Sequence, residues 1–447
     1  MKTKNIFYFL VSNFLKIFVF FIFLFARTFT GLEIYNFRLG ELIVGFCLLL
    51  FLYYVIFKTS IKKQYFLNDK KINLVLIFLL FIFIFQNINY GQSFSNNFIF
   101  KTSTFIWSIG GLAIGYYLLK IVNFKIYDYD IYLSLVGLIF IYIYNTHGIS
   151  DNRQDFLLNY TDKFEYSKGS DLLLALIFVF YLILCKFEFS NKSFILIATT
   201  TSLFLPLLTY KSRSGSLSLG IFLFFLFLEM RKKINFKSKT TIYTLVVSII
   251  LFIFSSSWVV NQDIVIDEEI GFELKYALTH RYSSINDNVY EKEVLKLKLF
   301  YIDQNRLKTT DGNLNWRLQI WQDVIVDMFT DKYYLFGYGY HDIIPAMFSD
   351  QRMGFDMTNI NVHNYIIHIL SRGGIVTLLL IWRFYLLLYK KFKKNNLVLD
   401  FNLIFYPLIF NSLFDPSMEN PHYPTIFFIL LGLSFNKSII FKESKSI

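Results

Sequence analysis

Long apolar runs recur along this chain and restrict the folds open to it. About twelve runs of roughly 15–25 residues alternate with short polar links, and 55% of all residues are hydrophobic. No water-soluble fold buries that much phenylalanine, isoleucine and leucine. We therefore predict an all-α polytopic membrane protein. The predicted spans are residues 6–26, 38–57, 73–89, 103–122, 131–147, 171–187, 193–210, 214–230, 240–260, 364–389, 400–414 and 423–437.

Lysine and arginine give these spans an orientation. Cytoplasmic links are enriched in basic residues, and with a cytoplasmic N-terminus the basic links all fall inside. They are Lys58–Lys71, Lys120–Lys125, Lys186–Lys192, Arg231–Lys239, Lys390–Lys394 and Lys437–Lys445. We expect both termini in the cytoplasm and the long loop outside, which in a bacterium means the periplasm or the outer surface. The net charge of +12 then reflects this inside bias, and short scattered basic clusters do not indicate nucleic-acid binding.

The same orientation divides the chain into three parts. Residues 1–260 hold spans one to nine, residues 261–362 form a large polar loop on the periplasmic face, and residues 363–447 hold spans ten to twelve and a cytoplasmic tail. Cys47 and Cys185 both fall in apolar spans, so we expect buried small side chains and no disulfide in the loop.

Arg213 is the first candidate for chemistry. It lies in Thr209-Tyr-Lys-Ser-Arg-Ser-Gly215, a very short outer link between two spans. A guanidinium there is suited to clamp an anion, because its planar fork of donors matches phosphate oxygens. The alternative is an interfacial arginine that extends its head group into water.

Arg317 is the second candidate. Residues 313–329 have helical periodicity, with Asn313 or Asn315 as the expected N-cap. Arg317 shares its face with Trp321 and with the apolar positions 324 and 328, so we expect it on the buried side, in need of a partner. A structural ion pair is the alternative. Arg281 is a weaker third candidate.

His363 is the proposed reactive group, with Asn364 as its neighbour. It lies where the large loop re-enters the membrane, and a histidine can take a proton from an attacking hydroxyl near neutral pH. A structural histidine is the alternative. Asp415 and Glu419, in a later outer link, are candidates to orient this histidine or a substrate, or else belong to a solvated turn.

One motif that resembles a metal-binding pair maps to the cytoplasmic side of the membrane. Asp128-Tyr-Asp130 has the spacing of a metal-binding pair of nucleotide-sugar transferases, but it maps to an inner link away from the loop. We therefore expect no metal and no cofactor.

At these residues the chain resembles the O-antigen ligase and polymerase superfamily of bacterial envelope glycosyltransferases. The family pattern is His-Asn, nine residues, then Gly-x-x-Gly/Thr. It is matched by His363-Asn364 and Gly374-Ile-Val-Thr377. The Arg-x-x-x-Trp helix with its Gly-x-Gly turn is matched by Arg317, Trp321, Gly337 and Gly339, and the Ser-Arg-Ser-Gly segment by residues 212–215. Thr377 replaces the more usual glycine, which the pattern tolerates.

The resemblance implies a GT-C-like fold and a metal-independent, inverting transfer of glycan from undecaprenyl diphosphate to an acceptor hydroxyl on the periplasmic face. Arg213 and Arg317 would hold the diphosphate, His363 would serve as base, and Asn364, Arg281 and Asp415 would complete the substrate site. The acceptor is either lipid A-core, for a ligase, or another lipid-linked repeat unit, for a polymerase. Membrane lipids are the other expected partners.

A transporter such as a lipid-linked oligosaccharide flippase is the alternative from another class. Transporters usually place ionisable residues near the middle of the bilayer and show internal repeats. Here the clearest charges within spans are Lys16, Arg372 and Arg383, and the sequence shows no repeat.

Overall fold

The structure is a computed structural model of the chain. It describes residues 33–34, 37–39, 42, 70–89, 110–112, 114–118, 126–147, 168–234, 238–260, 300–309, 311–340, 343–348, 361–420, 422–435 and 437. The predicted span 6–26, nearly all of span 38–57, most of span 103–122, the candidate Arg281 and the cysteine Cys47 lie outside these residues.

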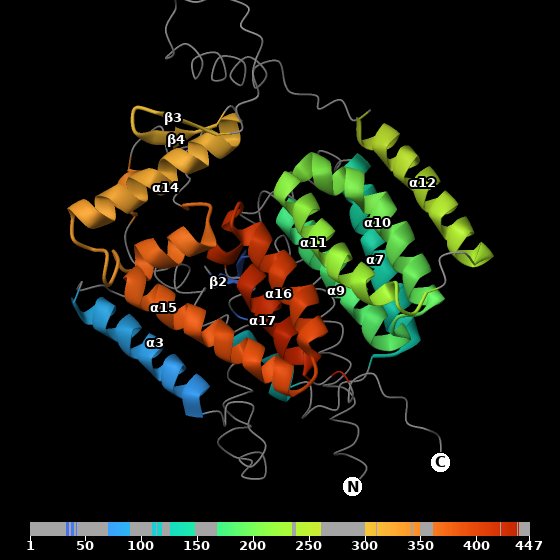
Figure 1. Ribbon diagram of the computed structural model, residues 1–447, viewed down its shortest axis with the longest axis horizontal. Coiled ribbons are helices and arrows are strands. Elements are labelled where there is room, and N and C mark those ends of the chain that lie inside the picture. The colour runs from blue at the N-terminus through green and yellow to red at the C-terminus, as the bar shows by residue number, and fades with distance from the viewer. Residues whose placement is uncertain are drawn as a thin grey trace, which may run out of the picture.

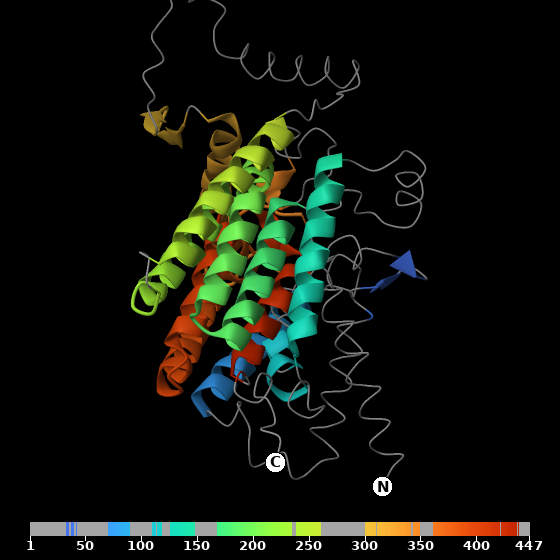
Figure 2. The ribbon, with the colours of Figure 1, turned by 90° about the vertical axis from the view of Figure 1, so that its right-hand side faces the viewer.

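The described residues form a bundle of helices that carries a small unit of one hairpin and one helix at one end (Figures 1 and 2). The bundle helices are α3 (Lys70–Asn89), α7 (Asp128–His147), α9 (Gly169–Phe187), α10 (Asn191–Lys211), α11 (Arg213–Met230), α12 (Lys239–Val260), α15 (Tyr365–Lys394), α16 (Val398–Ser412) and α17 (His422–Ser434). The short elements within or beside it are the π-helical turn η4 (Ile114–Leu118), the 3-10 turn η6 (Pro416–Glu419) and the paired strands β1 (Glu33–Ile34) and β2 (Phe37–Arg38).

The apolar runs that fall within the described residues form helices close to the predicted bounds. The run at 171–187, for example, is α9, and the run at 214–230 is α11. Among the described residues, six helices are long and apolar enough to cross a membrane, and three further apolar helices are shorter. The shorter α16 and α17 rise only on the order of 20 Å. The chain is thus a polytopic helical membrane protein.

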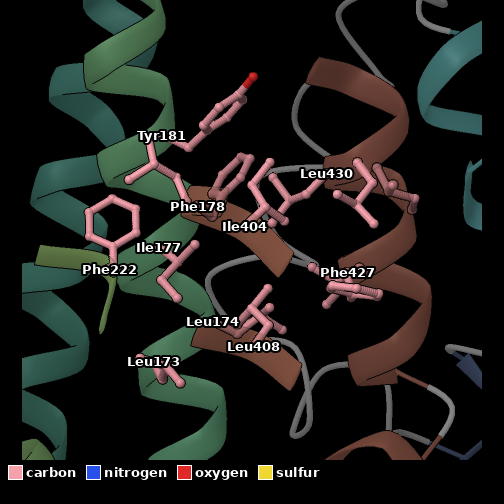
Figure 3. Close-up of a cluster of buried hydrophobic side chains, with 14 of the residues drawn as sticks. Leu173, Leu174, Ile177, Phe178, Tyr181, Phe222, Ile404, Leu408, Phe427 and Leu430 are labelled. Atoms are coloured by element: carbon pink, nitrogen blue, oxygen red, sulfur yellow. The ribbon is translucent and has the colours of Figure 1, made fainter. Parts of the chain in front are cut away.

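Helix α9 forms the centre of the bundle. It is buried along nearly its whole length, from Gly169 to Cys185, as expected of a helix that is apolar on every side. Figure 3 shows its side chains, among them Ile177 and Phe178, against Phe222 of α11 and Ile404 of α16. Because lipid tails are as apolar as leucine, such packing is stabilised by close contact more than by exclusion of water.

The outer helix α12 has the opposite character. It packs against α10 and exposes large apolar side chains along its length, including Tyr243, Ile249 and Ile253. In Figure 2 it runs along one side of the bundle beside α10. We expect this face to contact lipid.

Ion pairs between segments near the helix ends show which segments lie together at each end of the bundle. At one end, Arg213 pairs with Asp311 and His422 pairs with Asp171. At the other end, Lys186 pairs with Asp128. We call the first the loop end and the second the basic end. Which of the two ends faces the cytoplasm stays a prediction.

The loop unit at the loop end is built on helix α14 (Gly312–Thr330), with the antiparallel strands β3 (Tyr301–Asp303) and β4 (Arg306–Lys308) alongside it. The apolar side of α14, with Ile320 and Val324, packs on the 3-10 turn η5 (Pro345–Met347) and on Val362. The unit therefore has its own small core, and Figure 1 shows it above the start of α15.

Helix α15 is interrupted at Gly374, which has φ 69° and ψ −177°. The turn after α14, with Gly337 at φ 70° and Gly339 at φ 79°, is placed against this break. Tyr338 and Gly339 donate their backbone N–H groups to the carbonyls of Ser371 and Arg372. The break thus frees backbone groups of α15 that the glycine turn then binds, as buried backbone groups require.

We predict that Gly374→Ala destabilises the protein. A β-carbon at Gly374 would collide with the carbonyl of Leu335, and this backbone region is open almost only to glycine, at a cost on the order of 1–3 kcal/mol for other residues. Gly220→Ala in α11 is the control, since a β-carbon there meets no atom within 4 Å. Thermal unfolding in detergent should show a fall of several degrees for the first variant alone. Equal melting temperatures would contradict the role assigned to the break.

Candidate functional site

The start of α14 organises the candidate site. Asp311, and not Asn313 or Asn315 as predicted, is the N-cap, and its carboxylate accepts the backbone N–H of Leu314 at 2.9 Å. Asn315 instead accepts the backbone N–H of Thr309. Asp311, Asn313 and Asn315 are all residue types that favour the N-cap position. Which of them caps the helix therefore depends on how soon after β4 the helix begins.

Arg213 reaches α14 from the bundle. It begins α11, with Ser212 as the N-cap, and its guanidinium donates to the Asp311 carboxylate at 2.6 Å. The hydrogen bond from Leu314 and the charge of Arg213 hold the pKa of Asp311 below its usual value, against a smaller opposing effect of burial. The side chain of Arg213 is 84% exposed, so the guanidinium keeps donors open to a ligand.

Arg317 lies about one and a half turns into α14, on the side that faces the bundle, as the periodicity predicted. It donates a hydrogen bond to the backbone carbonyl of Phe414, in the link between α16 and η6. Burial lowers the pKa of Arg317, while the charges of Asp415 and Asp311 oppose that shift. An arginine remains protonated in proteins, so this is a partly desolvated cation between two carboxylates.

His363 lies directly before α15 in the left-handed backbone region, with φ 57°. Its ring meets the edge of Trp316, with ring centroids 5.2 Å apart. Trp316 precedes Arg317 on α14, and Asp311 caps the same helix. The contacts of Asp311 and Trp316 therefore place Arg213 and His363, from two distant parts of the chain, around the first turns of α14, which also carry Arg317.

Asn364 has a structural role in this arrangement. It is the N-cap of α15, and its side-chain oxygen accepts the backbone N–H groups of Ile366 and Ile367. Its side-chain amide donates to the carbonyl of Leu413 at 3.0 Å. The residue next to His363 thus ties the start of α15 to the end of α16.

The link after α16 supplies two carboxylates of different kinds. Asp415 is half-buried and acts electrostatically on Arg317. Glu419 is 1% exposed and accepts backbone N–H groups from both neighbours of His363. A solvated turn therefore does not describe Glu419. Its partner His368, also 1% exposed, was missed by the sequence analysis because a histidine inside an apolar span carries no local signal.

The metal-like pair lies elsewhere. Asp128 and Asp130 begin α7 at the basic end, where Asp128 pairs with Lys186 and Asp130 accepts the backbone N–H of Tyr127. Among the residues that the structure describes, no group of three or more His, Cys, Asp or Glu is placed to hold a metal ion.

Comparison with known proteins agrees with the motifs. Residues 197–382, less than half of the chain, match a family model described as O-antigen ligase. This match runs from α10 through the loop into α15 and includes Arg213, Arg281, Arg317, His363 and Asn364. It confirms the predicted resemblance to the O-antigen ligase and polymerase superfamily over this part of the chain. No curated protein matches the chain.

We predict that Asn364→Ala lowers the thermal stability of the protein, because the loss of an N-cap costs about 1 kcal/mol. Asn364→Ser keeps a side-chain oxygen for the cap and loses the amide donor to Leu413 without adding a charge, so it isolates the second contact. Melting temperatures in detergent should fall for both variants, and further for alanine. A stable alanine variant would contradict the capping role.

Proposed function

We propose that the protein is a membrane glycosyltransferase of the O-antigen ligase and polymerase type. In this proposal it moves a glycan from undecaprenyl diphosphate to an acceptor hydroxyl on the periplasmic face of the inner membrane, through a GT-C-like fold. The observation that carries it is the meeting of His363, Arg317 and Arg213 around the start of α14, within the residues that match the family model.

The two arginines suit the leaving group. When the bond between the anomeric carbon and the diphosphate breaks, negative charge grows on the lipid diphosphate, and fixed cations stabilise that charge. Arg213 offers exposed donors, and Arg317 is a cation that is already partly desolvated. Asp311 interacts with both, so we expect a diphosphate to compete with its carboxylate for Arg213.

His363 suits the role of base. The acceptor oxygen attacks the anomeric carbon, its proton passes to the imidazole, and the electron pair of the broken bond leaves with the diphosphate. A single displacement of this kind inverts the anomeric configuration. His363 is half-buried against Trp316, beside the start of α14, where we expect a substrate hydroxyl to reach it. Arg281 and Asp415 are proposed to bind the substrate.

The acceptor divides the proposal in two. A polymerase adds the growing chain to another lipid-linked repeat unit, and we favour it slightly because the external loop is long and the spans are rich in Phe and Tyr. A ligase transfers finished glycan to lipid A-core. Both use the same donor and the same site.

The transporter alternative has one structural observation in its favour. Arg372 is a charged residue inside α15 that is 1% exposed. Its guanidinium donates to the carbonyl of Gly339 at 3.1 Å, which ties the arginine to the glycine turn. The residue therefore has a structural role in seating the loop, and glycan transfer remains our conclusion.

We predict that His363→Ala abolishes transfer while the protein still accumulates in membranes. The surface polysaccharide of a deletion strain, run on a gel, should show core with one repeat unit for a polymerase, or bare core with lipid-linked polymer for a ligase. His363→Ala should reproduce that pattern, and His422→Gln, which alters another histidine at the loop end, should restore the wild-type ladder. A normal ladder with His363→Ala would make the histidine structural.

We predict that Arg213→Lys and Arg317→Lys each lower transfer at least about tenfold, because a point charge does not replace a planar fork of donors. Arg306→Lys is the matched control, since this loop arginine binds Asp323 and Gln319 away from the site. Transfer rates of the purified proteins check this. Full activity in both lysine variants would remove the proposed diphosphate site.

A further inference from the structure

The backbone at His363 is held in a conformation that a histidine rarely adopts. Its φ of 57° lies in the left-handed region, which costs free energy for any residue with a β-carbon. Such a residue keeps this conformation only where its surroundings fix it. The direction of the imidazole ring therefore depends on the groups that bind the chain on either side.

Glu419 binds the chain on both sides. One carboxylate oxygen accepts the backbone N–H of Val362 and the other that of Asn364, each at 3.2 Å. The residue is 1% exposed, so these are buried hydrogen bonds to a charged acceptor, which are stronger than neutral ones. A single side chain thus clamps the two peptide groups that flank His363.

His368, one turn into α15, is the side chain that pairs with the Glu419 carboxylate. Its Nδ1 lies 3.4 Å from Glu419 Oε2, and both side chains are 1% exposed. A buried carboxylate is costly unless it is paired and hydrogen-bonded. The two backbone donors and His368 together meet that requirement.

We propose that Glu419 and His368 are a buried positioning pair for His363, and this inference rests on the proposed role of His363 as base. Glu419 does not touch the substrate. It acts by fixing the left-handed turn, so that the imidazole stays against Trp316 of α14. The indole of Trp321 donates to the carbonyl of Val362 at 2.8 Å and holds the same segment from α14.

A carboxylate is required because both of its oxygens accept. In Glu419→Gln, an amide group replaces one acceptor and presents hydrogens to a backbone N–H. The turn then loses one of its two clamps with almost no change in side-chain volume. Since a displacement of about 1 Å costs on the order of a hundredfold in rate, we expect the turnover of the variant to fall by at least about tenfold.

The first test compares Glu419→Gln with Asp400→Asn in the purified full chain, in nanodiscs, with an undecaprenyl-diphosphate-linked repeat unit as donor. Asp400 is a matched control, because it is a buried carboxylate that accepts from Tyr181 and Lys437 at the basic end. We expect a lower kcat with an unchanged KM for the donor in Glu419→Gln, and wild-type values for Asp400→Asn. An unchanged kcat in Glu419→Gln overturns the proposal.

The second test does not depend on transfer. Diethyl pyrocarbonate modifies neutral imidazoles, and mass spectrometry gives the rate at His363 relative to His422, which keeps its partner Asp171. Release of the turn should speed modification of His363 several-fold in Glu419→Gln. If Glu419→Gln fails to accumulate, His368→Gln carries both tests.

The two readouts separate the two claims. An unchanged modification rate overturns the positioning pair whatever the protein catalyses. A faster rate in a protein whose wild type transfers no glycan leaves the positioning pair in place and overturns the proposed function.

Discussion

The arrangement of the candidate site depends on how α14 is seated on the bundle. Ile367 and Leu370 of α15 pack against the small apolar core of the loop unit, and polar contacts then fix the place of α14. Here Arg213 binds Asp311, Arg317 binds the carbonyl of Phe414, and Trp321 binds the carbonyl of Val362. The same contacts that hold the helix gather the proposed diphosphate clamp and the proposed base.

Asp311 takes part in several of these contacts, and this affects how the site would bind an anion. Asp311 is at once the cap of α14 and the partner of Arg213, and its charge also acts on Arg317. In the proposed function, a bound diphosphate would take the place of the Asp311 carboxylate as the partner of Arg213. The number of cations in the site would stay the same. The glycine turn at the other end of α14, seated on the break at Gly374, fixes the helix at its far end.

The sequence predicted the features that depend on a local pattern of residues, namely the helices and the side of α14 on which Arg317 lies. The apolar runs within the described residues form helices with nearly the expected bounds, as at 214–230. The helical periodicity around Arg317 also predicted correctly that this residue lies on the side of α14 that faces the bundle. The sequence did not predict what depends on distant partners. Asp311 displaced Asn313 and Asn315 as the cap, α15 runs on to Lys394 through an expected link, and the clamp of Glu419 on His363 joins residues more than fifty positions apart. Those features follow from packing, and no local motif encodes them.

In the proposed function the lipid diphosphate binds at the loop end, between Arg213 and Arg317, with His363 near the anomeric carbon. An experimental structure of the full chain in nanodiscs with undecaprenyl diphosphate bound would locate the two phosphates. We expect their density beside both guanidinium groups, at the start of α14. Diphosphate density at the basic end, or beside Arg372 within the bundle, would contradict the proposed function and would favour a transporter.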